Sequence, residues 1–145
     1  MKAIDIEVFH IAEVASLLIG EGKLEPKKKV ALKAVYHDPC RLGRRFGVFD
    51  EPRRVLAAIP GLDLVEFPRS RKNSLCCGGG GSVFFFEPEY AGWVTNERLT
   101  EAEYAGADAV VTACPICVRL FEDAIKEKKL KIKVFDLAEI LDKSL

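Results

Sequence analysis

The sequence predicts a three-layer α/β fold, in which a largely parallel, Rossmann-like sheet carries helices on both faces. Short runs of β-branched and aliphatic residues alternate with segments of helical periodicity, and parallel strands need such crossover helices. A length of 145 residues is enough for one well-buried core. Because no repeat or composition break divides the chain, we expect a single domain over residues 1–145, made of an N-terminal helix and linker (1–24) and an α/β core (25–145).

The first half of the chain opens with the pattern of an amphipathic helix. Over residues 4–20, Ile4, Val8, Ile11, Ala15 and Leu18 recur at steps of three and four, and the glycines that follow end the helix. The elements expected after a charged linker are a strand at 30–36, a loop around Gly43 and Gly47, a helix at 52–59, a strand at 62–67 and a short extended piece at 73–76.

The second half repeats the alternation of helix and strand. Pro88 suits the first turn of a long helix that runs to about Tyr104, because its missing N–H has no helical partner there. A buried strand at 109–113 precedes a helix that begins at Cys114. A last strand at 132–135 leads to Asp136, which we expect to cap a final helix ending near Leu141.

Charge and composition exclude several classes of function. Lys and Arg together number 22, as do Asp and Glu, so the formal net charge is zero. This balance argues against nucleic acid or an anionic membrane surface as the main partner. We also expect no signal peptide and no membrane span. A cytoplasmic location follows, where thiols stay reduced and metal binding is favoured over disulfides.

Two adjacent cysteines followed by four glycines, in Ser74 to Ser82, form the most unusual stretch of the chain. Cys76 and Cys77 can engage one object together only where the backbone bends, and glycine permits such bends. Glycine also lets backbone N–H groups converge on an anion. Thiolates beside such donors are what an iron–sulfur cluster needs, so Gly78, Gly79 and Gly80 are expected to surround its ligands.

The other three cysteines strengthen this interpretation. Cys40 precedes the pair, and Cys114 and Cys117 form a C-x-x-C motif after it, so the pattern uses all five cysteines of the chain. We expect each of these segments to follow a strand and therefore to meet at the carboxyl edge of the parallel sheet. A helix start favours thiolates at Cys114 and Cys117. Inert thiols, a dithiol redox site, zinc held by four cysteines and an iron–sulfur cluster are the alternatives.

The sequence resembles the cysteine-rich CCG domain of the heterodisulfide reductase catalytic subunit and of glycolate and lactate oxidase iron–sulfur subunits. The resemblance includes Tyr36 to Arg44, Val134 to Glu139 and the entry Phe9 to Val14, which is similar to the second of the family's usual two repeats. It implies a non-cubane [4Fe–4S] cluster as cofactor, with zinc as the alternative. The implied ligands are Cys40, Cys76, Cys77, Cys114 and Cys117.

Residues beside the cysteines have two interpretations each. His37 is a candidate catalytic residue that could donate to a thiolate or a cluster sulfur, or else a strand-end histidine bound to backbone. Arg41 and Arg44 could hold an anionic substrate, or belong to a solvated basic loop. Phe84, Phe85, Phe86 and Trp93 indicate core or a subunit interface, and exposure of the phenylalanines would favour the interface.

The main functional hypothesis is an iron–sulfur oxidoreductase module that passes electrons to a disulfide or a similar acceptor. The alternatives are a non-catalytic electron-relay subunit of a 2-hydroxy-acid oxidase and a structural zinc module. The expected partners are an electron-donor subunit with ferredoxin-type clusters or flavin, and a second CCG repeat or a second copy of this chain. With one repeat here, we expect no activity without a partner.

Overall fold

A computed structural model describes residues 6–145, and its centre is a four-stranded sheet in which all strands are parallel. The strand order is β2-β1-β3-β4, so β1 and β3 occupy the middle of the sheet. In register, Ala34 of β1 pairs with Leu64 of β2 and Ala109 of β3. The strands are β1 (Leu32–His37), β2 (Leu62–Val65), β3 (Ala109–Thr112) and β4 (Lys133–Asp136).

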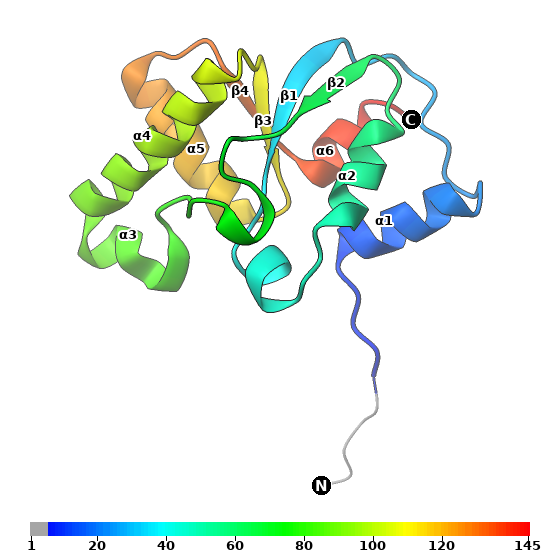
Figure 1. The fold of residues 1–145 in the computed structure, drawn as a ribbon, viewed down its shortest axis with the longest axis horizontal. Coiled ribbons are helices and arrows are strands. Elements are labelled where there is room, and N and C mark those ends of the chain that lie inside the picture. Colours follow the sequence, from blue (N-terminus) through cyan, green and yellow to red (C-terminus); the bar gives the residue numbers. More distant parts are fainter. Residues whose placement is uncertain (1–5) are drawn as a thin grey trace, which may run out of the picture.

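Helices cover both faces of the sheet, as Figure 1 shows with α4 and α5 on one side and α1, α2 and α6 on the other. The face under α4 and α5 buries Val35 of β1 and Val110 of β3, and the opposite face buries Tyr36 and Val111 from the same strands. This alternation follows from the two-residue period of a strand. The helices are α1 (Ile11–Gly20), α2 (Asp50–Ala57), α3 (Val83–Phe86), α4 (Pro88–Tyr104), α5 (Pro115–Lys128) and α6 (Leu137–Asp142).

The predicted three-layer α/β fold is therefore confirmed, and the four strands and helices α2, α4, α5 and α6 begin and end within a few residues of the expected positions. Pro88 begins α4, and Asp136 caps α6 by accepting a hydrogen bond from the N–H of Ala138 at 2.8 Å. Between residues 6 and 145, none of the helices combines the length and the apolar character that crossing a membrane requires.

The prediction of a helix from residue 4 is wrong over residues 6–10, which have no regular secondary structure, while residues 4 and 5 lie outside the described part. His10 begins the helix instead, because its ring Nδ1 accepts the N–H of Ala12 at 3.1 Å and Glu13 caps the N–H of His10. The apolar face was assigned only partly correctly. Ala15 packs in the core with α2 and α6 as predicted, but Ala12 joins it there and Ile11 is half exposed.

Two other local predictions are corrected. The loop expected around Gly43 forms a short π-helix, Arg41–Arg45, directly after the end of β1. No strand precedes the paired cysteines, because residues 74–77 run without regular structure between the short 3-10 turns Arg71–Asn73 and Gly80–Ser82. The cysteine loop therefore reaches the sheet edge by contacts with helices and side chains rather than by sheet pairing.

Candidate metal centre

The ends of the two central strands bring two of the predicted cysteine segments to one edge of the sheet. His37, the last residue of β1, is paired in register with Thr112, the last residue of β3. Cys40 follows β1 and begins the π-helix, and Cys114 follows β3 and precedes α5. Because parallel strands end at the same edge, Cys40 and Cys114 lie on the same side of the molecule, as the sequence predicts.

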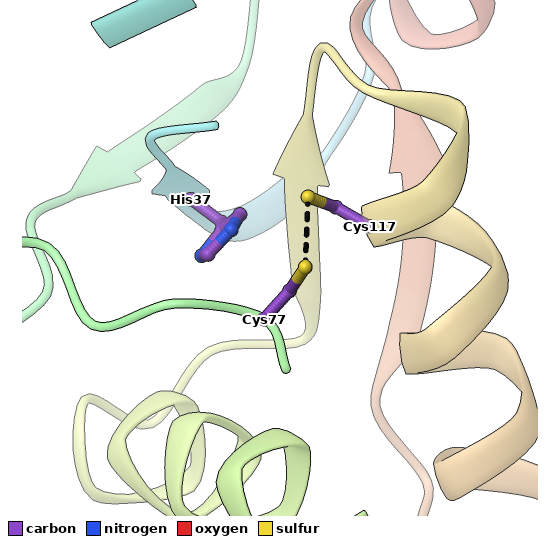
Figure 2. A group of neighbouring side chains, drawn as sticks. All are labelled: His37, Cys77 and Cys117. Carbon is purple, nitrogen blue, oxygen red and sulfur yellow. Dashed lines mark hydrogen bonds between the residues drawn. The ribbon is translucent and has the colours of Figure 1, made fainter. Parts of the chain in front are cut away.

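The centre of the site is a buried group formed by His37, Cys77 and Cys117 (Figure 2). A ligand atom from each residue lies within 4.8 Å of the others, and the sulfurs of Cys77 and Cys117 are 3.1 Å apart. These side chains come from the end of β1, the loop before α3 and the first turn of α5. Three segments distant in sequence thus present metal-binding atoms to one small volume.

Two more cysteines extend this group into a chain of four hydrogen-bonded sulfurs. Cys76 donates to Cys77, and Cys117 bonds to both Cys77 and Cys114. A hydrogen bond from Cys117 lowers the pKa of Cys114 to about 6, helped by backbone N–H groups at the start of α5. Hydrogen bonds from Cys117, Cys76 and His37 hold the pKa of Cys77 well below its usual range.

The two donor thiols show the opposite shift. The pKa values of Cys117 and Cys76 are raised, because each gives its proton to a neighbouring thiolate and is shielded from water. The pKa shifts of the four sulfurs therefore alternate in direction along the chain. A metal cation can take the place of the thiol protons, since the thiolate is the form that binds metal.

The glycines after the cysteine pair supply backbone donors to these sulfurs. The N–H of Gly78 points at the Cys76 sulfur from 3.4 Å, and the N–H of Gly80 also bonds to Cys76. The N–H of Gly79 bonds to Cys77. The three glycines thus stabilise negative charge on the two sulfurs, and their role around a cluster stays a prediction.

Cys40 is half-buried and follows the end of β1 at the same edge of the sheet. Within residues 6–145, the structure records no hydrogen bond between Cys40 and another cysteine. Its neighbours Pro39 and Arg41 line an apolar groove of about 580 Å³, which Cys114 also lines. The backbone around Cys40 therefore borders the same groove as Cys114, and the place of Cys40 as a fifth ligand stays a prediction.

The two arginines proposed for substrate differ in their contacts. Arg41 is exposed and lines the groove, together with Phe9, Phe46 and Pro115. Arg44 donates to the backbone carbonyl of Ser74 at 2.9 Å, so it ties the π-helix to the cysteine loop. The groove position keeps Arg41 available to an anionic group, whereas Arg44 has a structural contact already.

Sequence reasoning missed two buried arginines that hold this edge together. Arg53 of α2 forms a bidentate ion pair with Asp38, at 2.7 and 2.9 Å, and also binds Glu66. Arg98 of α4 is completely buried and its Nε lies 3.2 Å from Nδ1 of His37. Their positions in the sequence could have revealed them, because each arginine lies on the otherwise apolar face of its helix. A charge on that face requires a buried partner.

The donor set fits an iron–sulfur cluster or a metal ion. Two of the four linked sulfurs have lowered pKa values, backbone N–H groups donate to them, and Cys77 and Cys117 are almost entirely shielded from water. Buried, hydrogen-bonded thiolates are the ligands that such clusters use. Four sulfurs also suffice for tetrahedral zinc.

Similar proteins are oxidoreductases or their subunits, and one of them is named as iron–sulfur-binding. The chain is 38% identical over 144 residues to a subunit of the dihydromethanophenazine:CoB–CoM heterodisulfide reductase of Methanosarcina mazei, covering 99% of this chain and 35% of that protein. It is 36% identical over 141 residues to the probable iron-sulfur-binding oxidoreductase FadF of Bacillus subtilis, covering 96% of this chain and 20% of the relative. EtfAB:quinone oxidoreductase of Syntrophomonas wolfei is 36% identical over 148 residues, with coverage of 96% and 21%.

The chain spans only a fifth to about a third of the length of these relatives. The family model described as the cysteine-rich domain, CCG, matches residues 34–122, which contain all five cysteines and the ends of both central strands. By this match, the chain belongs to the CCG cysteine-rich domain family.

Proposed function

We propose that this chain is an iron–sulfur module of a heterodisulfide reductase-like oxidoreductase. The observation that carries the proposal is the chain of four hydrogen-bonded sulfurs, which backbone N–H donors meet at the carboxyl edge of the sheet. The residues that would hold a non-cubane [4Fe–4S] cluster are Cys40, Cys76, Cys77, Cys114 and Cys117. Such a cluster supplies one-electron transfer.

The chain's own residues have distinct tasks in this proposal. Gly78, Gly79 and Gly80 direct N–H groups at the Cys76 and Cys77 sulfurs, which spreads negative charge and stabilises a reduced site. Burial of Cys77 and Cys117, at 3% and 2% exposure, keeps water from the centre. Reduced thiols of this kind fit a cytoplasmic compartment.

The groove beside Cys114 favours an acceptor site over a pure electron relay. Its volume of about 580 Å³ is in the range of small-molecule pockets, and its walls are mostly apolar with Arg41 at the rim. We propose that a disulfide or similar acceptor enters here, with Arg41 attracting an anionic substituent. Electrons would come from a partner subunit that carries ferredoxin-type clusters or flavin. The relay subunit of a 2-hydroxy-acid oxidase-type complex is the alternative.

A first test replaces a central ligand. Anaerobic reconstitution with iron and sulfide is expected to give about four iron atoms per chain, and Cys117→Ser is expected to reduce this to below about one. The melting temperature should fall with the iron content, because metal binding is coupled to folding. Iron and sulfide quantitation, EPR and thermal unfolding measure the two effects. Unchanged iron content and melting temperature would contradict thiolate ligation.

Cys40→Ser separates the cluster from zinc. Since Cys40 alone has no recorded bond to another cysteine within residues 6–145, a zinc ion held by the other four would survive this substitution. A five-cysteine cluster would not. Loss of iron and of the EPR signal in Cys40→Ser supports the cluster, and stoichiometric zinc that is retained in this variant supports the structural alternative.

Exposed aromatic side chains on α3 and α4 form the proposed partner surface. The side chains of Phe85 and Phe86 are 72% and 80% exposed, and those of Tyr90 and Trp93 are also exposed. Covering apolar surface contributes about 25 cal/mol for each Å² removed from water. We therefore propose that this surface binds a second CCG domain, either in a second copy of this chain or in a partner.

Phe85→Asp tests this surface. Wild-type protein should scatter light as more than a monomer at micromolar concentration, and the variant should be a monomer. Tyr104→Asp is the matched control, because Tyr104 is 86% exposed on the same helix as Tyr90 but lies about 20 Å along it. If the wild type is a monomer, the surface binds a CCG domain of a different chain rather than a second copy of this one. If Phe85→Asp still associates, the aromatic surface is not the interface.

A further inference from the structure

Arg98 is a charged side chain with no exposed surface, in the middle of α4. Its Nη1 donates to the carbonyl of Arg69 at 2.8 Å and to the carboxylate of Glu101, and its Nη2 donates to the hydroxyl of Ser74 at 3.1 Å. Its guanidinium carbon lies 3.4 Å from the centre of the Phe67 ring. The guanidinium therefore has one fixed position and orientation.

The Nε–H of the same guanidinium points at Nδ1 of His37 from 3.2 Å. Arginine has donors only and does not lose its proton in proteins, so Nδ1 of His37 must be the acceptor. A neutral imidazole with an accepting Nδ1 carries its single proton on Nε2. Contact with Arg98 thus selects one of the two tautomers of His37.

The ring of His37 is held in place on its other sides as well. It is 1% exposed and makes an edge-to-face contact with Phe121 of α5, with ring centres 5.0 Å apart. The hydroxyl of Thr112 anchors the His37 carbonyl at 3.1 Å. The ligand atoms of His37 and Cys77 lie within 4.8 Å of each other, and with Nδ1 occupied the nitrogen left to donate to the Cys77 sulfur is Nε2.

We infer that Arg98 is a positioning residue for the candidate metal centre. It fixes His37 in the tautomer whose Nε2–H donates to the Cys77 sulfur, and this hydrogen bond raises the reduction potential of the group that Cys77 holds. Hydrogen bonds to ligand sulfurs draw electron density away from iron, which makes the reduced state easier to form. The effect on potential rests on the proposed function, whereas the tautomer does not.

The tautomer is tested by NMR of nitrogen-15-labelled full chain in reduced, metal-free form. The chain has two histidines, and His10→Asn keeps a helix cap while leaving only the signals of His37. We expect a proton on Nε2 and none on Nδ1. In Arg98→Met the two tautomers should mix, whereas Arg69→Met should change nothing, since Arg69 shares Glu101 but does not contact His37. A proton on Nδ1 of the wild type would overturn the proposal.

The potential is tested on the reconstituted protein by redox titration followed by EPR. Arg98→Met and His37→Phe should both shift the midpoint to more negative values, and His37→Gln, which keeps an N–H donor, should stay close to wild type. Arg98→Met in the His37→Gln background should then produce no further shift. If Arg98→Met does not fold, the comparison of His37→Gln with His37→Phe still decides the point. Equal midpoints in those two variants would refute it.

Pulsed EPR provides a third outcome. A strongly coupled nitrogen that disappears in His37→Phe would make His37 a ligand, and the hydrogen-bond role would be wrong. Failure to incorporate iron in the wild type would instead count against the proposed function and leave the NMR result standing. The two hypotheses therefore fail separately.

Discussion

Replacing Arg53 with methionine is expected to lower the free energy of unfolding by about 3–5 kcal/mol. The substitution keeps an apolar stem but removes the charge that faces Asp38, whose side chain is only 2% exposed. Asp38 would retain the backbone N–H of Arg71, at 2.7 Å, as a donor, and its carboxylate would stay buried without a counter-charge. Urea unfolding of the reduced protein, followed by circular dichroism, measures the loss.

Arg54→Met is the matched control for this measurement. Arg54 is the next residue of the same helix, its side chain is 62% exposed, and its ion pair with Glu51 lies at the surface. Surface pairs contribute about 0–1 kcal/mol, so this variant should stay close to wild type. Arg53→Met combined with Asp38→Asn should recover part of the stability, because the neutral amide needs no counter-charge. A loss that is as large in Arg54→Met as in Arg53→Met would contradict the explanation.

The sheet and most helices were predictable because hydrophobic periodicity determines them. β3 is buried on both faces and reads as the uninterrupted apolar run Ala109 to Val111, as a central parallel strand does. Pro88 and Asp136 mark helix starts by local chemistry that depends on no distant residue. Elements whose ends are set by their own sequence are therefore the ones that were predicted well.

The errors lie where tertiary contacts or weak signals decide. Residues 6–10 share the helical periodicity of α1, yet the histidine cap at His10 starts the helix later, and histidine is not among the usual capping residues. The π-helix after Cys40 is anchored by the contact between Arg44 and Ser74, which joins segments 30 residues apart. Local patterns contain no information about such a contact.

The cysteines of the candidate site could be proposed from sequence, whereas the side-chain network around them could not. Chemistry-bearing residues at a strand end can be recognised by type and spacing, because the topology of a parallel sheet brings such ends together. The contact of Arg98 with His37 joins residues 61 positions apart and depends on how α4 lies over the sheet. A buried arginine in the sequence indicates that it has a hydrogen-bonding partner, but only the tertiary structure shows which residue that partner is.

Gly78→Ala is expected to destabilise the protein by about 2–4 kcal/mol and to abolish stable cluster incorporation. Gly78 has a φ of +96°, which side chains rarely adopt, and an added methyl group would lie 2.4 Å from the backbone carbonyl oxygen of Ala91 in α4. A backbone atom inside a helix cannot move aside as a flexible side chain could. The cysteine loop itself would therefore have to retreat from α4.

This displacement of the loop would break the contacts that position the sulfurs of the cysteine pair. The carbonyl of Cys77 accepts a hydrogen bond from the Thr95 hydroxyl at 2.6 Å, and the N–H of Gly78 donates to Cys76. Gly80→Ala is the control, because φ there is outside the left-handed region and a methyl group would meet only the Cys76 sulfur, at an ordinary 3.8 Å. Iron content and urea unfolding should separate the two variants clearly. If Gly78→Ala binds as much iron as Gly80→Ala, close packing of the loop on α4 does not position the cysteine pair.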